Sequence, residues 1–264
     1  MLNVQDLLCK YVTGCPAAWQ AITIHQLLTQ TSGIPDLSSF ADFQSNIANP
    51  MTPAQLVDWL KNKPLFFPPS TKFINSSSGY DLLGYIIEQV SGKSYEAFLK
   101  GNIFDPLNMA DTGYDPEGSN LSTGYTDFPN NKKADLHLWL SFSGGGLYSS
   151  VEDLYMWDQA LNTEKLVPQK LLDEMFKPQV QGGSGSDLGY GQTSLSYGYG
   201  WLIQTYNGHL TISHGSNGSG YSGEYLRFPN DKFTVIILGN RDDPTMGSFN
   251  PIEDTIFRNF LNMQ

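Results

Sequence analysis

Apolar side chains recur at three- and four-residue intervals through the first two thirds of the chain. The clearest run covers residues 78–90, where leucine, isoleucine and valine share one helical face before Gly92 stops the helix. Thr52-Pro53-Ala54-Gln55 is a capping box with proline in the first turn, so it predicts the start of another helix. Serines before the apolar runs at 95–104 and 151–161 predict two more helices.

The period changes to two at about residue 190. Alternating apolar and polar residues predict successive antiparallel strands at 197–205, 209–214, 223–228 and 233–238, and the Gly/Ser-rich stretch 181–196 before them is expected to be a loop. Residues 251–261 have the spacing of a closing amphipathic helix. This order predicts an α+β fold, an antiparallel sheet flanked by helices, in a single domain over 1–264. The helical region is expected at about 20–175, and the sheet with its C-terminal helix at about 190–264.

Charge and cysteine content narrow the classes of partner. The formal net charge is −11, from 15 basic and 26 acidic residues, and the only adjacent basic pair is Lys132-Lys133. This pattern argues against a nucleic-acid binder, and the longest apolar run, at 235–238, is too short to span a membrane. Cys9 and Cys15 do not have CxxC spacing and no histidine cluster accompanies them, so we expect no metal site. We also expect no cofactor. Two interpretations of the cysteines stay open: two buried thiols, or a local disulfide formed in an oxidising compartment.

Residues 22–37 read ITIHQLLTQTSGIPDL, and four further motif blocks lie at 73–91, 103–114, 144–161 and 214–221. In this order, the five blocks resemble the serine hydrolase family of class C β-lactamases, penicillin-binding proteins, D-alanyl-D-alanine carboxypeptidases and family VIII esterases. The resemblance implies a β-lactamase/transpeptidase-like fold with a helical subdomain. It also implies hydrolysis of β-lactams, D-Ala-D-Ala peptides or esters through an acyl-enzyme, with a small-molecule or peptide substrate and a periplasmic or secreted location.

The family's nucleophile is a Ser-x-x-Lys pair, in which the lysine accepts the serine's proton. None of the twelve lysines here has a serine three residues before it. Residues 2–11 resemble the stretch that follows this pair in the family. We therefore expect a chain that begins after the nucleophile and lacks the N-terminal segment.

The family's Tyr-x-Asn element is altered, because Asn75 stands at the tyrosine position and Ser77 at the asparagine position. An asparagine side chain does not titrate, so Asn75 cannot serve as a general base. The plain alternative is that this serine-rich stretch caps the helix that follows it.

The third element, a Lys/His-Thr/Ser-Gly strand, survives as His214-Gly215-Ser216. The resemblance makes His214 a family-equivalent catalytic position, and it implies that Ser213 and Ser216 offer hydroxyls to a substrate. Asn217 would supply the N–H of that strand to an oxyanion. The alternative is a structural histidine on a strand.

Three functions remain open. The first is a truncated serine hydrolase that is inactive as it stands, and the second is a non-catalytic binding or scaffold relative, a pseudoenzyme. The third, an enzyme with a displaced nucleophile at Ser77 or Ser216, has no adjacent base to support it. By the same resemblance, the missing segment would leave a sheet edge uncovered, through which the chain is expected to associate.

Overall fold

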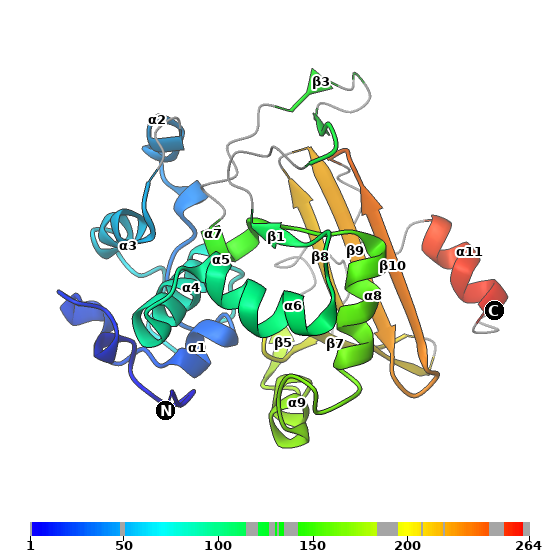
Figure 1. Cartoon of the computed structure of the whole chain (residues 1–264). Helices are drawn as coiled ribbons and strands as arrows, with labels where there is room; N and C mark the ends of the chain where they lie inside the picture. Colours follow the sequence, from blue (N-terminus) through cyan, green and yellow to red (C-terminus); the bar gives the residue numbers. More distant parts are fainter. Residues whose placement is uncertain are drawn as a thin grey trace. The chain divides into compact units, whose positions relative to one another are not determined.

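The chain forms two compact units, which we describe separately. The computed structural model describes residues 2–47, 51–114, 121–126, 130, 132–134, 142–183, 195–206, 208–218, 220–242 and 251–260. The first unit comprises residues 1–119 and 137–149, and the second comprises residues 120–136 and 150–264. Figure 1 draws the helices and strands of both units and labels most of them.

The first unit is mainly helical, and its helices begin where the sequence supplies caps. Thr52 caps α3 with a reciprocal box through Gln55, and Ser76 accepts a hydrogen bond from the backbone N–H of Gly79 at the start of α4. Gly92 ends α4 in the left-handed conformation, at φ +67°. The elements are η1 (Leu8–Lys10), η2 (Ala17–Trp19), α1 (Ile24–Leu28), η3 (Leu37–Ser39), α2 (Phe43–Ile47), α3 (Pro53–Lys61), α4 (Ser77–Ser91), α5 (Tyr95–Leu99), η4 (Lys100–Phe104), α6 (Asp105–Leu107), α7 (Phe142–Gly145) and the strand pair β1 (Gly113–Tyr114) with β4 (Leu147–Tyr148).

The two cysteines are joined. Cys9 and Cys15 form a disulfide whose Cα atoms lie 5.4 Å apart, within the range that a disulfide spans. It closes a short loop that begins in η1. Of the two interpretations left open by the sequence, the structure contains the local disulfide.

α7 lies unusually close to α4, and a glycine permits this approach. A Cβ atom at Gly84 would lie 1.9 Å from the hydroxyl oxygen of Ser143 and 2.3 Å from its Cβ. The Ser143 hydroxyl donates a hydrogen bond to the Tyr80 carbonyl of α4 at 2.9 Å. The helix pair therefore has no room for a side chain at position 84.

Gly84→Ala should lower the free energy of unfolding by about 1–3 kcal/mol, because the added methyl group overpacks the α4–α7 contact. The matched control is Gly101→Ala in η4, where a Cβ atom meets nothing within 4 Å. Chemical denaturation of both variants measures the difference. Adding Ser143→Gly to Gly84→Ala should recover most of the lost free energy of unfolding. If it recovers none, the destabilisation does not come from the contact between positions 84 and 143.

The second unit contains a six-stranded antiparallel sheet in the order β10-β9-β8-β7-β6-β5. The predicted strand at 209–214 continues to Gly218, and the one at 223–228 begins at Tyr221. The loop predicted at 181–196 was wrong at both ends, where two short strands pair; residues 184–194 lie outside the described part. The elements are β2 (Tyr125–Thr126), β3 (Lys132–Lys133), α8 (Val151–Ala160), α9 (Gln169–Met175), β5 (Val180–Gly183), β6 (Leu195–Tyr197), β7 (Leu202–Tyr206), β8 (His209–Gly218), β9 (Tyr221–Phe228), β10 (Phe233–Gly239) and α11 (Pro251–Phe260).

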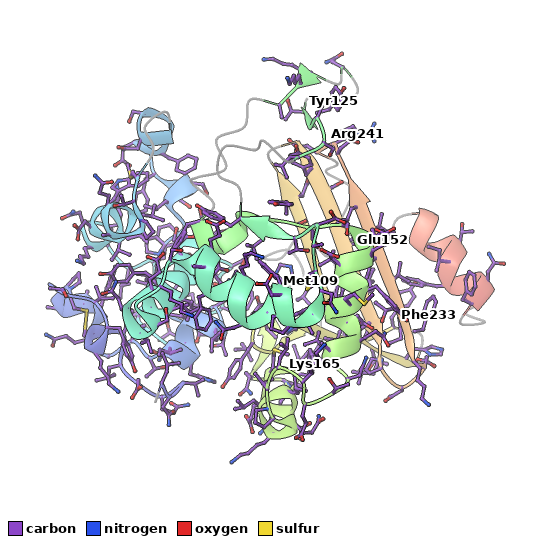
Figure 2. The ribbon with its side chains drawn as sticks, in the orientation of Figure 1. Met109, Tyr125, Glu152, Lys165, Phe233 and Arg241 are labelled. Atoms are coloured by element: carbon purple, nitrogen blue, oxygen red, sulfur yellow. A yellow bond between two sulfur atoms is a disulfide. The ribbon has the colours of Figure 1, made fainter. Side chains whose placement is uncertain are left out.

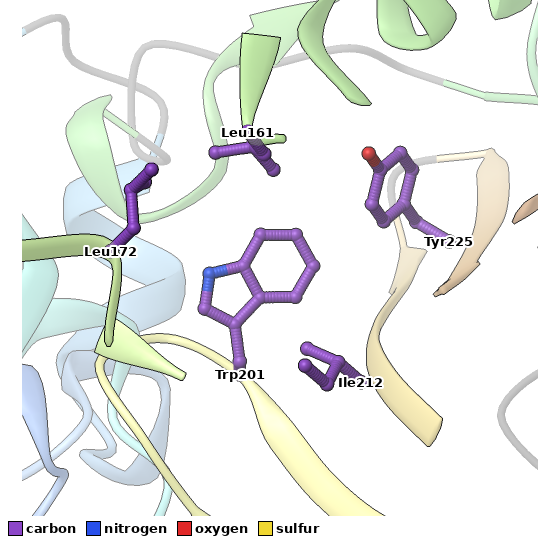
Figure 3. Packing of buried hydrophobic residues seen from close by; sticks show 5 residues of the cluster. All are labelled: Leu161, Leu172, Trp201, Ile212 and Tyr225. Carbon is purple, nitrogen blue, oxygen red and sulfur yellow. The ribbon is translucent and has the colours of Figure 1, made fainter. Parts of the chain in front are cut away.

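Helices pack on both faces of this sheet. On one face, the sheet side chains of the cluster are Trp201, Ile212 and Tyr225. They pack with Leu161, which directly follows α8, and with Leu172 of α9 (Figure 3). On the other face, Phe257 of α11 packs against Phe228 with ring centroids 5.3 Å apart. Figure 1 shows α8 and α11 on opposite sides of β10. The α8–sheet–α11 layering agrees with the expected sheet flanked by helices.

A buried ionic network ties α8 to the sheet. The carboxylate oxygen Oδ1 of Asp158 accepts hydrogen bonds from Arg227 Nε at 2.7 Å, and from the hydroxyls of Tyr225 and Thr234 at 3.0 Å. Arg227 Nη2 also donates to Asn162 Oδ1 at 2.8 Å. The Asp158 and Arg227 side chains are each only 4% exposed, so the paired charges are almost fully removed from water.

Candidate functional site

The altered Tyr-x-Asn segment sits at the N-terminus of α4 and is held by hydrogen bonds to two other segments. Gln30, at φ +59°, accepts from the Ser76 backbone N–H and donates from Nε2 to Asn75 Oδ1, both at 3.0 Å. Asp36 Oδ2 accepts from the Ser77 backbone N–H at 2.8 Å. The exposed side chains of Asn75 and Ser77 are therefore carried on a backbone fixed from both sides.

This segment offers hydrogen bonds but no proton-transfer group. The Asn75 amide is neutral at any working pH, and Gln30 holds its oxygen. Asp36 is engaged by the Ser77 and Ser38 backbone N–H groups and by the Ser38 hydroxyl. Within the described residues, no base is hydrogen-bonded to the Ser77 hydroxyl. The cap interpretation is compatible with this geometry, since Ser76 is the N-cap residue.

A buried carboxyl lies one helical turn beyond Ser77. Asp81 is 3% exposed, and its Oδ1 accepts from the backbone N–H of Gly144 in α7 at 2.8 Å. Burial raises the pKa of Asp81 to about 8, and the negative charge of Asp36 adds to the rise, while the backbone N–H groups of Gly144 and Ser143 oppose it. Sequence reasoning missed Asp81; the available signal was an acidic residue inside the apolar run at 78–90.

The surviving third element lies on β8 in the second unit. His214 and Ser216 point to one face of the sheet and are exposed, because side chains alternate along a strand. Ser213 points to the other face and is only 2% exposed. Of the two hydroxyls expected to meet a substrate, only that of Ser216 therefore reaches solvent.

In the described part of the sheet, β8 is longer than its pairing with β7. The pairing of β8 with β7 ends at Ser213, whereas its pairing with β9 continues to Gly218. Among the described strands, β7 pairs with β8 only as far as Ser213, so the exposed side chains of His214 and Ser216 lie beyond the part of β8 that β7 covers.

The described residues contain no cluster of three or more His, Cys, Asp or Glu residues that could hold a metal ion. Among the same residues, no helix has the length and apolar character of a membrane span. His209 and His214 lie on opposite faces of β8, as expected for an odd separation, and His209 Nδ1 lies 2.9 Å from Asp231 Oδ2. The two histidines therefore do not form a ligand pair.

Comparison with known proteins adds to this geometry. The family model described as Beta-lactamase matches residues 2–253. Penicillin-binding protein 4* of Bacillus subtilis is 30% identical over 269 residues, which cover 93% of this chain and 56% of that protein. Putative penicillin-binding protein PbpX of the same organism is 32% identical over 72% of this chain and 46% of its own length. The chain spans about half the length of these curated relatives.

Solved structures show the same architecture. The octameric penicillin-binding protein homologue from Pyrococcus abyssi superimposes with a TM-score of 0.78 at 26% identity, over 100% of this chain and 61% of that one. A D-stereospecific amidohydrolase from Streptomyces sp. gives a TM-score of 0.79 at 23% identity, over 100% and 80% of the two chains. At that identity, the second likeness concerns the fold alone.

Proposed function

The chain belongs to the β-lactamase family of serine hydrolases. From that premise we propose that these 264 residues bind a β-lactam or a D-Ala-D-Ala peptide without hydrolysing it. The predicted family and the β-lactamase/transpeptidase-like α+β fold are confirmed. The observation that carries the proposal is the lack of an activated nucleophile. No serine precedes any lysine by three residues, and Asn75 replaces the family's titratable tyrosine.

Acyl transfer needs a hydroxyl with an adjacent base, since a free serine is a weak nucleophile. Ser77 and Ser216 are both exposed hydroxyls in the described structure, yet neither is hydrogen-bonded to a base there. The Asp36 carboxylate accepts a hydrogen bond from the backbone N–H of Ser77, not from the Ser77 hydroxyl. A displaced nucleophile at either serine therefore has little physical support.

The ligand-binding parts are better preserved than the catalytic ones. Beyond the residues that β7 covers, β8 carries Ser216 as an exposed donor, with His214 beside it on the same face. We assign these two side chains to the carboxylate of a β-lactam or a D-Ala-D-Ala peptide, and the family resemblance assigns Asn217 as an N–H donor on the strand. Ser213 is assigned a structural role, because its hydroxyl is buried on the other face.

A parent hydrolase is the second candidate, favoured by the fact that the curated relatives are about twice as long as this chain. In such a protein, a Ser-x-x-Lys pair from outside these residues would supply the nucleophile. The coding sequence next to this chain tests the idea directly. An in-frame Ser-x-x-Lys would support it, and a stop codon without one would leave the binding function.

Intact-mass measurement after exposure to penicillin G and, separately, to a fluorophosphonate tests the lack of turnover. We expect no mass gain, whereas a penicillin-binding protein treated in parallel should retain a penicilloyl group from penicillin G and a phosphonyl group from the fluorophosphonate. A stoichiometric adduct on this chain would overturn the proposal, and peptide mapping would then identify the nucleophile.

Binding should depend on Ser216 and not on Ser213. Ser216→Ala should raise the Kd for a D-Ala-D-Ala peptide about tenfold, because one hydrogen bond to a charged carboxylate is lost. Ser213→Ala is the matched control, with the same atoms removed from the opposite face of β8. Titration calorimetry measures the Kd of the two variants and of the unaltered chain. Equal values for all three would show that Ser216 does not contact the peptide.

We assign the protein to an oxidising compartment, periplasmic or extracellular, on the basis of the Cys9–Cys15 disulfide. The natively purified chain should contain no thiol that reacts with iodoacetamide, and two such thiols after reduction. Mass spectrometry counts them. Two reactive thiols in the unreduced protein would contradict the assignment.

A further inference from the structure

Gln30 holds the segment that carries Asn75 through three hydrogen bonds. Its backbone carbonyl accepts from the Ile74 N–H at 3.2 Å, its Oε1 accepts from the Ser76 N–H at 3.0 Å, and its Nε2 donates to Asn75 Oδ1 at 3.0 Å. Gln30 lies just after α1, which packs against α4, and Figure 2 draws the side chains of both helices as sticks. Gln30 is only 5% exposed, so its bonds to this segment are largely shielded from water.

The backbone conformation of Gln30 is unusual for its residue type. Its φ of +59° lies in the left-handed region, which residues other than glycine rarely adopt. Neighbouring contacts hold it there, since the Ser70 N–H donates to the Thr31 carbonyl at 2.8 Å. Strained conformations of this kind persist only where the surrounding structure over-determines them, and they concentrate at functional sites. Gln30 is therefore a candidate for a role in the site beyond packing.

The orientation of both side-chain amides follows from one unambiguous donor. A backbone N–H can only donate, so the Gln30 atom that bonds to the Ser76 N–H must be the oxygen, Oε1. The other terminal atom of Gln30, Nε2, can also only donate, so the Asn75 atom that it meets must be the oxygen, Oδ1. Asn75 therefore turns its oxygen to Gln30, and its other terminal atom, Nδ2, carries two N–H donors.

We infer that Gln30 is a positioning residue that makes Asn75 a hydrogen-bond donor, so that this position of the site selects a ligand by a carbonyl oxygen. The inference rests on the proposed binding function and names the group of a β-lactam or a D-Ala-D-Ala peptide that Asn75 contacts. Both ligands carry amide carbonyl oxygens, which accept from an N–H. A ligand N–H at the same place would meet a second donor and gain no hydrogen bond.

The orientation of the Asn75 amide can be measured without a ligand. In a chain labelled with ¹⁵N in its asparagine and glutamine side chains, the Gln30 Nε2 protons should exchange slowly with water and the Asn75 Nδ2 protons rapidly. Gln30→Glu replaces Nε2 with an oxygen, and at pH 7 the new carboxylate is ionised and repels Asn75 Oδ1. The Asn75 amide should then turn, and its Nδ2 protons should exchange slowly. Slow exchange of these protons in the unaltered chain would overturn the inference, because an acceptor of the protein would already bind them.

Titration calorimetry with an N-acetylated D-Ala-D-Ala peptide tests the contact with the ligand. Asn75→Asp keeps an oxygen for Gln30 Nε2 but replaces the N–H groups of Nδ2 with a second oxygen, so the Kd should rise at least tenfold. Gln30→Glu should raise the Kd to a similar extent by turning the Asn75 amide. If Gln30→Glu fails to fold in a thermal melt, Asn75→Asp alone decides, because the Asn75 side chain is exposed.

Gln26→Glu is the matched control for the new charge. It makes the same change four residues earlier, and the Gln26 Oε1 bond to the Thr23 N–H is kept. The partner of Gln26 Nε2 is the Ser70 hydroxyl, at 2.6 Å, which can rotate and donate to a carboxylate. The Kd should therefore stay unchanged. A rise equal to that of Gln30→Glu would assign the effect to charge alone and overturn the inference.

A double-mutant cycle shows whether Gln30 acts through Asn75. Asn75→Ala should raise the Kd about tenfold, and adding Gln30→Glu should raise it no further, because no amide is left to turn. Additive losses would overturn the inference, since Gln30 would then act by distorting the whole segment.

The same titrations separate this inference from the proposed function. If the unaltered chain does not bind the peptide, both fail. If it binds, and Asn75→Ala and Asn75→Asp leave the Kd unchanged, the proposed function stands and the role of Gln30 and Asn75 is refuted.

Discussion

Asp158→Ala should lower the free energy of unfolding by about 3–5 kcal/mol, because it leaves the buried charge of Arg227 without its partner. The two side chains are each 4% exposed and their atoms lie 2.7 Å apart, so water cannot replace the lost carboxylate. The hydroxyls of Tyr225 and Thr234 lose the same acceptor. Urea denaturation followed by tryptophan fluorescence measures the change, since the Trp201 ring lies 5.5 Å from that of Tyr225.

The matched control is Asp173→Ala in α9 of the same unit. Asp173 is exposed and accepts one hydrogen bond, from Gln169 at 2.9 Å, so its loss should cost less than about 1 kcal/mol. Adding Arg227→Met to Asp158→Ala should recover much of the stability by removing the unpaired charge. If the single variants at 158 and 173 lose equal stability, the buried network does not hold α8 to the sheet.

The stability of the first unit should fall as the pH rises from about 4 to about 8, because Asp81 is buried as a neutral acid. Its pKa is about 8 in the folded protein, against an ordinary value of 3.8. A raised folded pKa stabilises the fold fully below the unfolded pKa, and this contribution is lost as the pH rises through the folded pKa. The slope should approach about 1.4 kcal/mol per pH unit within that window and vanish above it.

Asp81→Asn isolates this effect. The amide keeps an acceptor for the Gly144 N–H and cannot ionise, so the variant should lose this slope and exceed the unaltered chain in stability at pH 9. Asp58→Asn changes an aspartate whose side chain is 70% exposed and should leave the pH dependence unchanged. Parallel stability–pH curves for the Asp81→Asn variant and the unaltered chain would show that Asp81 is ionised in the fold across this range.

Much of the local structure could be predicted from the sequence. The helix starts at Thr52 and before Ser77 depend on hydrogen bonds between residues three apart, and the strands after residue 195 depend on alternation within a few residues. The sequence also determined which family motifs these 264 residues carry. The lack of Ser-x-x-Lys among them and the asparagine at position 75 are properties of the printed sequence and do not depend on the fold.

Tertiary packing decided the remainder, because it depends on which distant segments meet. Asp81 and Asp58 are the same residue type in two helices, yet only contact with α7 turns the first into a buried acid. Asp158 and Arg227 are 69 residues apart, so no local pattern pairs them. Periodicity within one segment predicts which face is apolar. Which other segment covers that face is determined only when the whole chain packs.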